Sequence, residues 1–153
     1  MAEFIPIGII HSPYSKKSDA PIQAAFSGAE GTVEVFEEFA DGLMDLEGFS
    51  HIWLIYHFDR SDGYSLTVKP YLDSEERGVF ACRAPRRPNA IGMSLVELVS
   101  VEGNILQVKG PDMLDGTPLL DIKPYIPEFD DRPHPRIGWL EGKVSGAPGA
   151  KGG

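Results

Sequence analysis

Short apolar segments separated by turn residues form the main hydrophobic pattern of the chain. Residues 4–11 and 32–36 are rich in β-branched or alternating apolar positions and predict two strands. Residues 51–58 are nearly all apolar, which is typical of a strand buried on both faces. A shorter run at 65–71 contains Pro70 near its end, which favours an edge strand or a strand terminus. We therefore expect many short strands.

The segment from Met93 to Lys109 predicts a hairpin. Two apolar runs, 95–101 and 105–108, flank a short turn formed by Glu102-Gly103-Asn104, in which glycine and asparagine tolerate positive φ. A brief run at 119–127 follows, after several turn residues. These segments add further strands to the expected sheet.

Helical spacing occurs in one place. Apolar residues recur there at intervals of three and four, and Gly48 supplies a C-terminal stop; the residues are Phe36, Phe39, Leu43 and Leu46. The 17 Gly and 13 Pro punctuate many short strands, which indicates a mainly β fold, an antiparallel barrel or sandwich with one or two short helices. The absence of βαβ alternation and of the GxGxxG and GxxxxGK[ST] motifs disfavours a Rossmann or P-loop protein.

Length and composition fit one soluble domain. The chain has 153 residues, of which 42% are hydrophobic and 24% charged, and this argues against wholesale disorder. We expect the domain to span residues 1–143 and a disordered, Gly-rich tail to span 144–153. No apolar run approaches the roughly 18 residues needed to cross a bilayer, and the N-terminus does not resemble a signal peptide. We therefore expect a cytoplasmic protein with no membrane partner.

The cysteine and histidine content disfavours a metal site. Cys82 is the only cysteine, which excludes an internal disulfide and any multi-cysteine zinc site. Its neighbour Arg83 would lower a thiol pKa, although a small buried hydrophobe is the commoner role for a lone cysteine. His51 and His57 lie about 20 Å apart along one predicted strand, so they cannot share a metal. We expect no metal.

Charge is distributed unevenly along the chain. The formal net charge is -9, from 23 Asp and Glu against 14 Lys and Arg, and residues 30–47 contain seven acids and no base. In contrast, residues 78–94, which we call the arginine loop, contain three arginines and no acid. An acidic protein has little general affinity for nucleic acid, because that affinity comes from Lys and Arg. Any RNA partner would therefore bind to a local patch.

The arginine loop is the first candidate site. Arg83, Arg86 and Arg87 fall within five positions, and Pro85 and Pro88 stiffen the backbone around them. Guanidinium clusters commonly bind carboxylate or phosphate, which favours an anion site over a solvated loop whose arginines pair with surface acids. Nearby, an amide for a base or ribose edge and a residue that permits close backbone approach are supplied by Asn89 and Gly92.

Residues 111–125 are the second candidate. Asp115-Gly116 is a turn dipeptide and Thr117-Pro118 restarts an extended segment, which on spacing alone indicates a hairpin connection. The alternative is a glycine turn whose Asp and Thr hold a polar ligand. A carboxylate, an ammonium and a phenol then alternate along one strand face and predict a polar site or an interface network: Asp121, Lys123 and Tyr125.

With these motifs in order, the chain resembles the TrmO/TsaA-like family, which includes tRNA adenosine N6-methyltransferases. The resemblance covers most of residues 7–129 and rests on four stretches: IGIIHSPY, LEGFSHIWLIYHF, GVFACRAPRRPNAIGMSLVEL and DGTPLLDIKPYIP. It implies a single antiparallel β-barrel, unlike Rossmann methyltransferases, that binds S-adenosylmethionine and forms a homodimer. The implied reaction transfers a methyl group to N6 of threonylcarbamoyl-adenosine next to the tRNA anticodon.

The resemblance also implies site residues. Eleven positions would contact the cofactor: Pro21, Ile22, Gln23, Asp59, Arg60, Arg83, Met93 through its backbone, Asp115, Gly116, Thr117 and Pro118. Ile22 and the Asp59-Arg60 pair differ from the residues that the family often has there. Six positions would bind the substrate: Arg86, Arg87, Asn89, Asp121, Lys123 and Tyr125.

The chemistry of the implied reaction is compatible with these residues. A bidentate arginine–carboxylate pair would distinguish threonylcarbamoyl-adenosine from plain adenosine. The acceptor nitrogen must also lose a proton, and the sequence does not choose among Asp115, Asp121 and Tyr125, so the catalytic residue stays unassigned. Two alternative functions remain open at this point: an S-adenosylmethionine-binding regulatory module and a methyltransferase for a small carboxylated metabolite.

Overall fold

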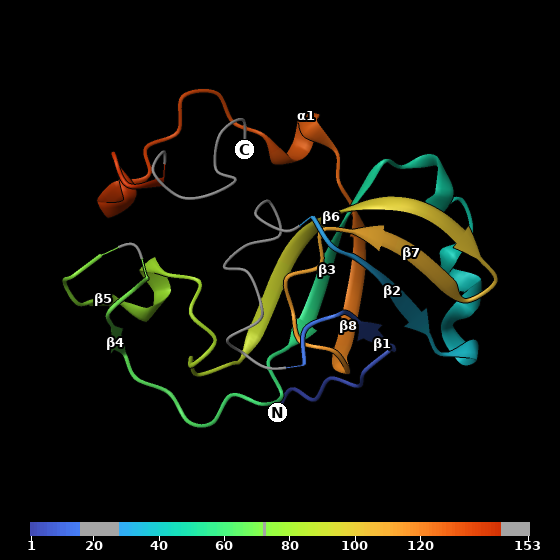
Figure 1. The fold of residues 1–153 in the computed structure, drawn as a ribbon, viewed down its shortest axis with the longest axis horizontal. Coiled ribbons are helices and arrows are strands. Elements are labelled where there is room, and N and C mark those ends of the chain that lie inside the picture. Colours follow the sequence, from blue (N-terminus) through green and yellow to red (C-terminus); the bar gives the residue numbers. More distant parts are fainter. Residues whose placement is uncertain (16–27, 72, 145–153) are drawn as a thin grey trace.

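The main body of the protein is a closed six-stranded antiparallel barrel (Figure 1). The computed structural model describes residues 1–15, 28–71 and 73–144. The strands follow one another around the barrel in the order β1-β2-β7-β6-β3-β8. Their bounds are β1 Gly8–His11, β2 Glu30–Val35, β3 His51–His57, β6 Ile91–Glu102, β7 Ile105–Lys109 and β8 Thr117–Pro124. The prediction of a mainly β protein with a single antiparallel barrel is confirmed.

Alternation along the strands fills the barrel interior. In β3, the side chains of Ile52, Leu54 and Tyr56 are buried, whereas the residues between them are half-buried. The strand is therefore less covered on its outer face than the nearly all-apolar sequence predicts. Inward residues of the neighbouring strands complete the core, among them Ile10, Val33, Val96, Leu106, Val108 and Leu119.

The predicted hairpin is present and is formed by β6 and β7. Gly103 adopts φ 61° in the turn, a conformation that favours glycine. Asn104 ties this turn to the end of β2, because its Nδ2 donates to the Val35 carbonyl at 2.8 Å and its own carbonyl accepts from the Val35 amide at 2.9 Å. The hairpin is thus fixed to the barrel at its tip.

Short helices lie outside the strands. The segment predicted to be helical forms two 3₁₀ helices, η3 Glu37–Leu43 and η4 Leu46–Gly48. Leu43 and Leu46 are buried there and join the barrel core. One α-helical turn, α1 Pro127–Asp130, follows β8. None of the helices in the described parts of the chain is long and apolar enough to cross a membrane.

A small lobe stands beside the barrel (Figure 1). It consists of the two-stranded sheet of β4 Thr67–Val68 and β5 Arg77–Gly78, the 3₁₀ turn η5 Val79–Ala81, and the C-terminal 3₁₀ turn η6 Gly138–Leu140. The strand predicted at 65–71 is therefore reduced to two residues, and the strand predicted at 4–11 begins only at Gly8. Nearly all of the predicted tail lies outside the described residues.

Candidate functional site

One end of the barrel, which we call the site rim, carries most of the predicted site. At this end β1, β3 and β7 finish and β2, β6 and β8 begin, because neighbouring strands run antiparallel. Asp59 and Arg60 follow β3, the arginine loop leads into β6, and residues 115–118 begin β8. The topology thus places segments that are distant in sequence at the same rim.

Arg60 connects two of these segments. Its Nη2 donates to the Asp115 carbonyl at 2.8 Å and to Thr117 Oγ1 at 3.3 Å, and its Nε donates to Asp59 Oδ1 at 3.3 Å. Thr117 Oγ1 donates in turn to the Leu114 carbonyl at 2.6 Å. The guanidinium therefore holds the turn before β8 against the end of β3, and sequence reasoning had placed both segments in one site.

The turn before β8 is also tied to the end of β1. The Ser12 amide donates to Asp115 Oδ1 at 3.1 Å, and His11 Nδ1 lies 3.5 Å from the same oxygen. The Asp115 and Gly116 amides donate to the carbonyls of Tyr14 and Ile10, at 2.7 and 2.9 Å. Gly116 has φ 84°, which few other residues adopt. These bonds fix the Asp115 carboxylate at the site rim.

The three arginines of the loop have different surroundings. Arg87 Nη1 donates to the carbonyls of Cys82 and Ala84, each at 3.0 Å, so this guanidinium braces the loop itself. Arg86 is exposed, and its Nε donates to the Asp62 carbonyl at 3.2 Å. This bond aligns Arg86 with the segment after Arg60. The brace by Arg87 is a structural role that the sequence did not predict.

A buried polar chain, which sequence reasoning missed, lies within reach of Arg83. Tyr56 donates to Ser94 Oγ at 2.8 Å, and Ser94 donates to Asp112 Oδ1 at 2.6 Å. Burial raises the pKa of Tyr56 well above its ordinary value, and the Asp112 carboxylate adds to this, whereas the Ser94 hydrogen bond and the charge of Arg83 oppose it. In the sequence, this polar chain could have been recognised from two polar residues, Tyr56 and Ser94, at inward positions of predicted strands.

Ser61 is a second residue that sequence reasoning missed. It follows Arg60, and its buried hydroxyl oxygen has no hydrogen-bond partner within the described residues. A buried polar atom without a partner is rare and costly. A polar group of a bound molecule would satisfy it, which supports a ligand position beside Arg60.

Other predicted residues lie elsewhere. Asp121 and Lys123 form an ion pair of 3.2 Å on the outer face of the barrel, opposite Ile55 and Trp53. Tyr125, beyond the end of β8, donates to both carboxylate oxygens of Asp131 at 2.8 and 2.9 Å, and this bond raises its pKa. Of the three candidate proton acceptors, only Asp115 is therefore at the site rim.

The remaining predicted positions lie on β6, in the arginine loop, or outside the described residues. Met93 lies on β6, and its exposed side chain is on the outer face of the barrel. Asn89 is exposed, and its carbonyl accepts from the Ile91 amide at 2.7 Å. The cofactor positions Pro21, Ile22 and Gln23 lie outside the described residues. Within 1–15, 28–71 and 73–144, no group of three or more His, Cys, Asp and Glu side chains is arranged to hold a metal ion.

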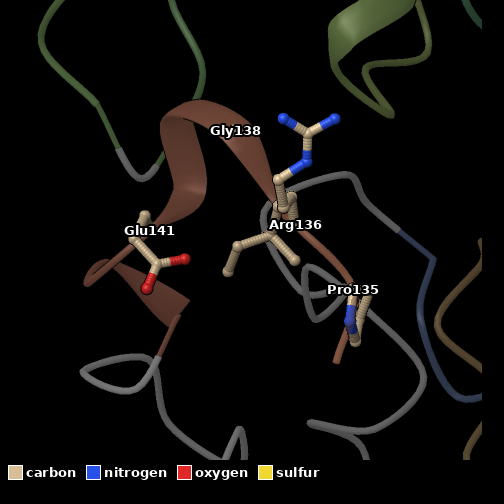
Figure 2. Close-up of a pocket in the computed structure, with 5 residues that line it drawn as sticks. Pro135, Arg136, Gly138 and Glu141 are labelled. Carbon is tan, nitrogen blue, oxygen red and sulfur yellow. The ribbon is translucent and has the colours of Figure 1, made fainter. Parts of the chain in front are cut away.

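Two cavities lie away from the site rim. An open hollow of about 950 Å³ is lined by a single segment, residues 135–138 with Glu141 (Figure 2). An apolar groove of about 350 Å³ lies at the opposite end of the barrel, between the η3–η4 region and the end of β8, and includes Phe39, Leu43 and Ile122. Asp121 is the one predicted site residue that lines either cavity, and it belongs to the groove at the end of the barrel opposite the site rim.

Comparison with known proteins identifies the family of the chain. Residues 9–131 match the model of the tRNA-methyltransferase O N-terminal domain, abbreviated TrmO_N. The chain belongs to this family. A crystal structure of TrmO from Pseudomonas aeruginosa superposes with a TM-score of 0.76 at 38% identity, covering 91% of this chain and 62% of that one. The resemblance seen in the motifs is therefore confirmed for fold and family.

Relatives of this family carry two kinds of name. A probable S-adenosyl-L-methionine-binding protein of Pyrococcus abyssi is 62% identical over 140 residues, which cover 91% of this chain and 76% of the relative. The human tRNA (adenine(37)-N6)-methyltransferase is 39% identical over 133 residues, which cover 82% of this chain but only 30% of the human protein. The chain thus spans only part of the length of the human protein and of the Pseudomonas aeruginosa structure.

Proposed function

We propose that the protein is an S-adenosylmethionine-dependent tRNA methyltransferase that modifies N6 of threonylcarbamoyl-adenosine next to the anticodon. The observation that carries the proposal is the single site rim, where the Arg60–Asp115–Thr117 cluster meets the arginine loop. Membership of the TrmO_N family and the names of its relatives support the same cofactor and reaction. A tRNA substrate also supports the predicted cytoplasmic location.

The residues at the rim fit the proposed cofactor in chemical type. Arg83 offers a guanidinium for its carboxylate, and Arg60 holds residues 115–117 in place at the rim through the Asp115 carbonyl and the Thr117 hydroxyl. The unsatisfied Ser61 hydroxyl supplies a further polar contact. When bound, the cofactor supplies a methyl group activated on a sulfonium. Catalysis then depends mainly on alignment of that methyl with the acceptor nitrogen, and Asp115, the candidate proton acceptor at the site rim, would take the released proton.

The arginine loop divides between cofactor and substrate in this proposal. Arg83, beside the Tyr56 chain, faces the cofactor. Arg86 is exposed and aligned by the Asp62 carbonyl, which suits it to the threonyl carboxylate or to a tRNA phosphate. Arg87 reaches the substrate only with the nitrogens that do not brace the loop. Asn89 supplies an exposed amide for a base or ribose edge.

A homodimer is part of the proposal. The outer face of β6 carries the exposed apolar side chains of Ile91 and Met93 beside half-buried Leu95, next to half-buried Ile55 of β3. Exposed apolar side chains on an acidic protein favour association with a second copy. A dimer would bring Asp121, Lys123 and Tyr125, which border this face, nearer to a bound substrate.

Mass spectrometry of tRNA nucleosides tests the reaction. Incubation with S-adenosylmethionine should add one methyl mass to threonylcarbamoyl-adenosine, and tRNA binding should weaken steeply with salt because phosphate contacts release counterions. Cofactor binding by calorimetry without transfer to any RNA would favour the regulatory module. Transfer that bulk tRNA fails to inhibit would favour a small-metabolite methyltransferase.

Two variants test the division of the arginine loop. Arg86→Ala should lower tRNA methylation roughly 10- to 100-fold at unchanged cofactor affinity, because a charge-assisted hydrogen bond is worth about 1.5–3 kcal/mol. Arg83→Ala should lower the affinity for the cofactor more than it lowers binding of tRNA. Arg132→Ala is a matched control, since its guanidinium binds the carbonyls of Phe129 and Asp131 away from the rim. Equal loss of cofactor affinity in Arg83→Ala and Arg86→Ala would contradict the division.

A further inference from the structure

The C-terminal segment of the described chain contacts the first residues of the arginine loop, which belong to the lobe. Trp139, in η6, donates from Nε1 to the carbonyl of Ala81, in η5, at 2.9 Å. The two residues are 58 positions apart in sequence. Figure 1 shows η6 beside the β4–β5 sheet, at the end of a long connection from α1.

An ion-pair cluster reinforces this contact. The Asp73 carboxylate, whose side chain is only 5% exposed, accepts from Lys143 Nζ at 2.9 Å and from Arg77 Nε at 2.6 Å. Both cations also lie over the Trp139 ring, at 5.4 Å for Arg77 and 5.9 Å for Lys143. One carboxylate and one indole ring therefore share the same two cations, and Trp139 and Lys143 come from the C-terminal segment.

The contact is connected to the substrate arginines through two residues. Ala81, the acceptor of the Trp139 bond, precedes Cys82, whose carbonyl accepts from Arg87. The lobe end of this connection is itself fixed, because Val79 is buried and its amide donates to the Leu66 carbonyl at 2.9 Å. A shift of η5 would therefore move the loop that carries Arg86 and Arg87.

We propose that Trp139 and Lys143 are positioning residues, which together with Asp73 form a C-terminal clamp on the arginine loop. The clamp holds η5 and the loop in the shape that binds the anionic substrate, and it touches neither substrate nor cofactor. The inference rests on the proposed function for its effect on tRNA, whereas its effect on loop order stands independently. Binding of a polyanion by a preordered loop avoids the entropy cost of fixing that loop during binding.

Hydrogen exchange on the full chain tests the clamp without any activity assay. Trp139→Ala should speed exchange of the Val79, Cys82 and Arg87 amides by roughly tenfold or more, with no change in strand β7 of the barrel, because only the local opening free energy falls. Trp139→Phe keeps an aromatic ring for the two cations but lacks the N–H, so its effect should be intermediate. Unchanged exchange at these three amides would overturn the clamp.

Kinetics test the positioning role. Lys143→Ala should raise KM for tRNA roughly five- to tenfold and leave kcat unchanged, since loop order is needed for substrate binding. Lys143→Arg should restore most of the loss because it keeps the charge beside Asp73. Glu141→Ala, an exposed change in the same segment, is the matched control and should have no effect.

The outcomes separate the clamp from the proposed function. Absence of methyl transfer by the unmodified protein would reject the function, while the exchange measurements would still decide whether the clamp exists. Faster loop exchange with an unchanged KM for tRNA would overturn the positioning role. A global loss of stability in Trp139→Ala would appear as faster hydrogen exchange in strand β7. The comparison of Lys143→Ala with Lys143→Arg would then decide whether the clamp exists.

Discussion

Gly92 lies where β6 passes the rings of Tyr56 and Phe58. A Cβ at Gly92 would come within 2.5 Å of Tyr56 Cε2 and 2.7 Å of Phe58 Cζ. The rings have little freedom to move, because they pack edge-to-face at 5.3 Å and Tyr56 is bonded to Ser94. Gly92→Ala should therefore lower the free energy of unfolding by about 1–3 kcal/mol.

Urea denaturation measures this effect. Gly48→Ala is the matched control, since no atom lies within 4 Å of the added methyl there. The same variant should disturb the Tyr56–Ser94–Asp112 chain and with it the surroundings of Arg83. A loss of stability in Gly92→Ala no larger than in Gly48→Ala would contradict the close approach.

At this scale the sequence predicted chemistry better than contacts. It indicated an anion site at the arginine loop because guanidinium and proline content can be read locally. It did not indicate that Arg87 braces the loop, since that depends on where the carbonyls of Cys82 and Ala84 point. Tyr56 was also missed, because its hydroxyl acquires meaning only when another strand brings Ser94 beside it.

Among the elements, the turn of the β6–β7 hairpin is tied to the end of β2 by the Asn104 side chain, in addition to the backbone pairing of β2 with β7. Asn104→Ala removes the Nδ2 bond to the Val35 carbonyl and leaves that acceptor without its side-chain donor. The expected loss of stability is about 1–2 kcal/mol, with faster exchange of the Val35 amide, whose partner is the Asn104 carbonyl. Thermal denaturation and hydrogen exchange measure both effects. Glu102→Ala, an exposed change at the same turn, should neither lower the stability nor speed exchange of the Val35 amide. Equal effects of the two variants would contradict the role of the Asn104 hydrogen bond.

Elements with strong local signals were predicted well. The hairpin has a turn sequence that selects positive φ, and β3 has a long apolar run. The strand expected at 65–71 shrank to Thr67–Val68 because its partner, Arg77–Gly78, is equally short. The helical segment at 36–46 formed 3₁₀ turns instead of an α-helix. The order of the strands was not predictable from the sequence pattern, because it depends on how distant strands pair to close the barrel.

The whole molecule separates its charges by position. The net charge is -9, yet one rim of the barrel combines Arg60, Arg83 and Arg86. Pairing of strands distant in sequence creates this rim, since Asp59-Arg60 and residues 115–118 are more than 50 positions apart. The family resemblance located these segments in one site before the fold was known; periodicity alone did not.

Acid pH provides a test that involves the full chain. Hydrogen bonds from Lys143 and then Arg77 hold the pKa of Asp73 well below its ordinary value of about 3.9. A carboxyl with a lowered folded pKa stabilises the protein fully above the unfolded pKa, and this contribution is lost as pH falls through the folded pKa. The contribution of Asp73 to the free energy of unfolding should therefore be complete from neutral pH to about pH 5 and decrease below about pH 4.

The variant Asp73→Asn isolates this contribution. The unfolding free energy of the unmodified protein should exceed that of Asp73→Asn at neutral pH, and the difference should shrink as the pH falls below about 4, because the unfolded chain then binds a proton that the folded Asp73 carboxylate does not. Urea denaturation at a series of pH values measures the difference, in which the titration of all other carboxyls cancels. A constant difference for Asp73→Asn would show that Asp73 acts by packing alone and that charge does not join the C-terminal segment to the lobe.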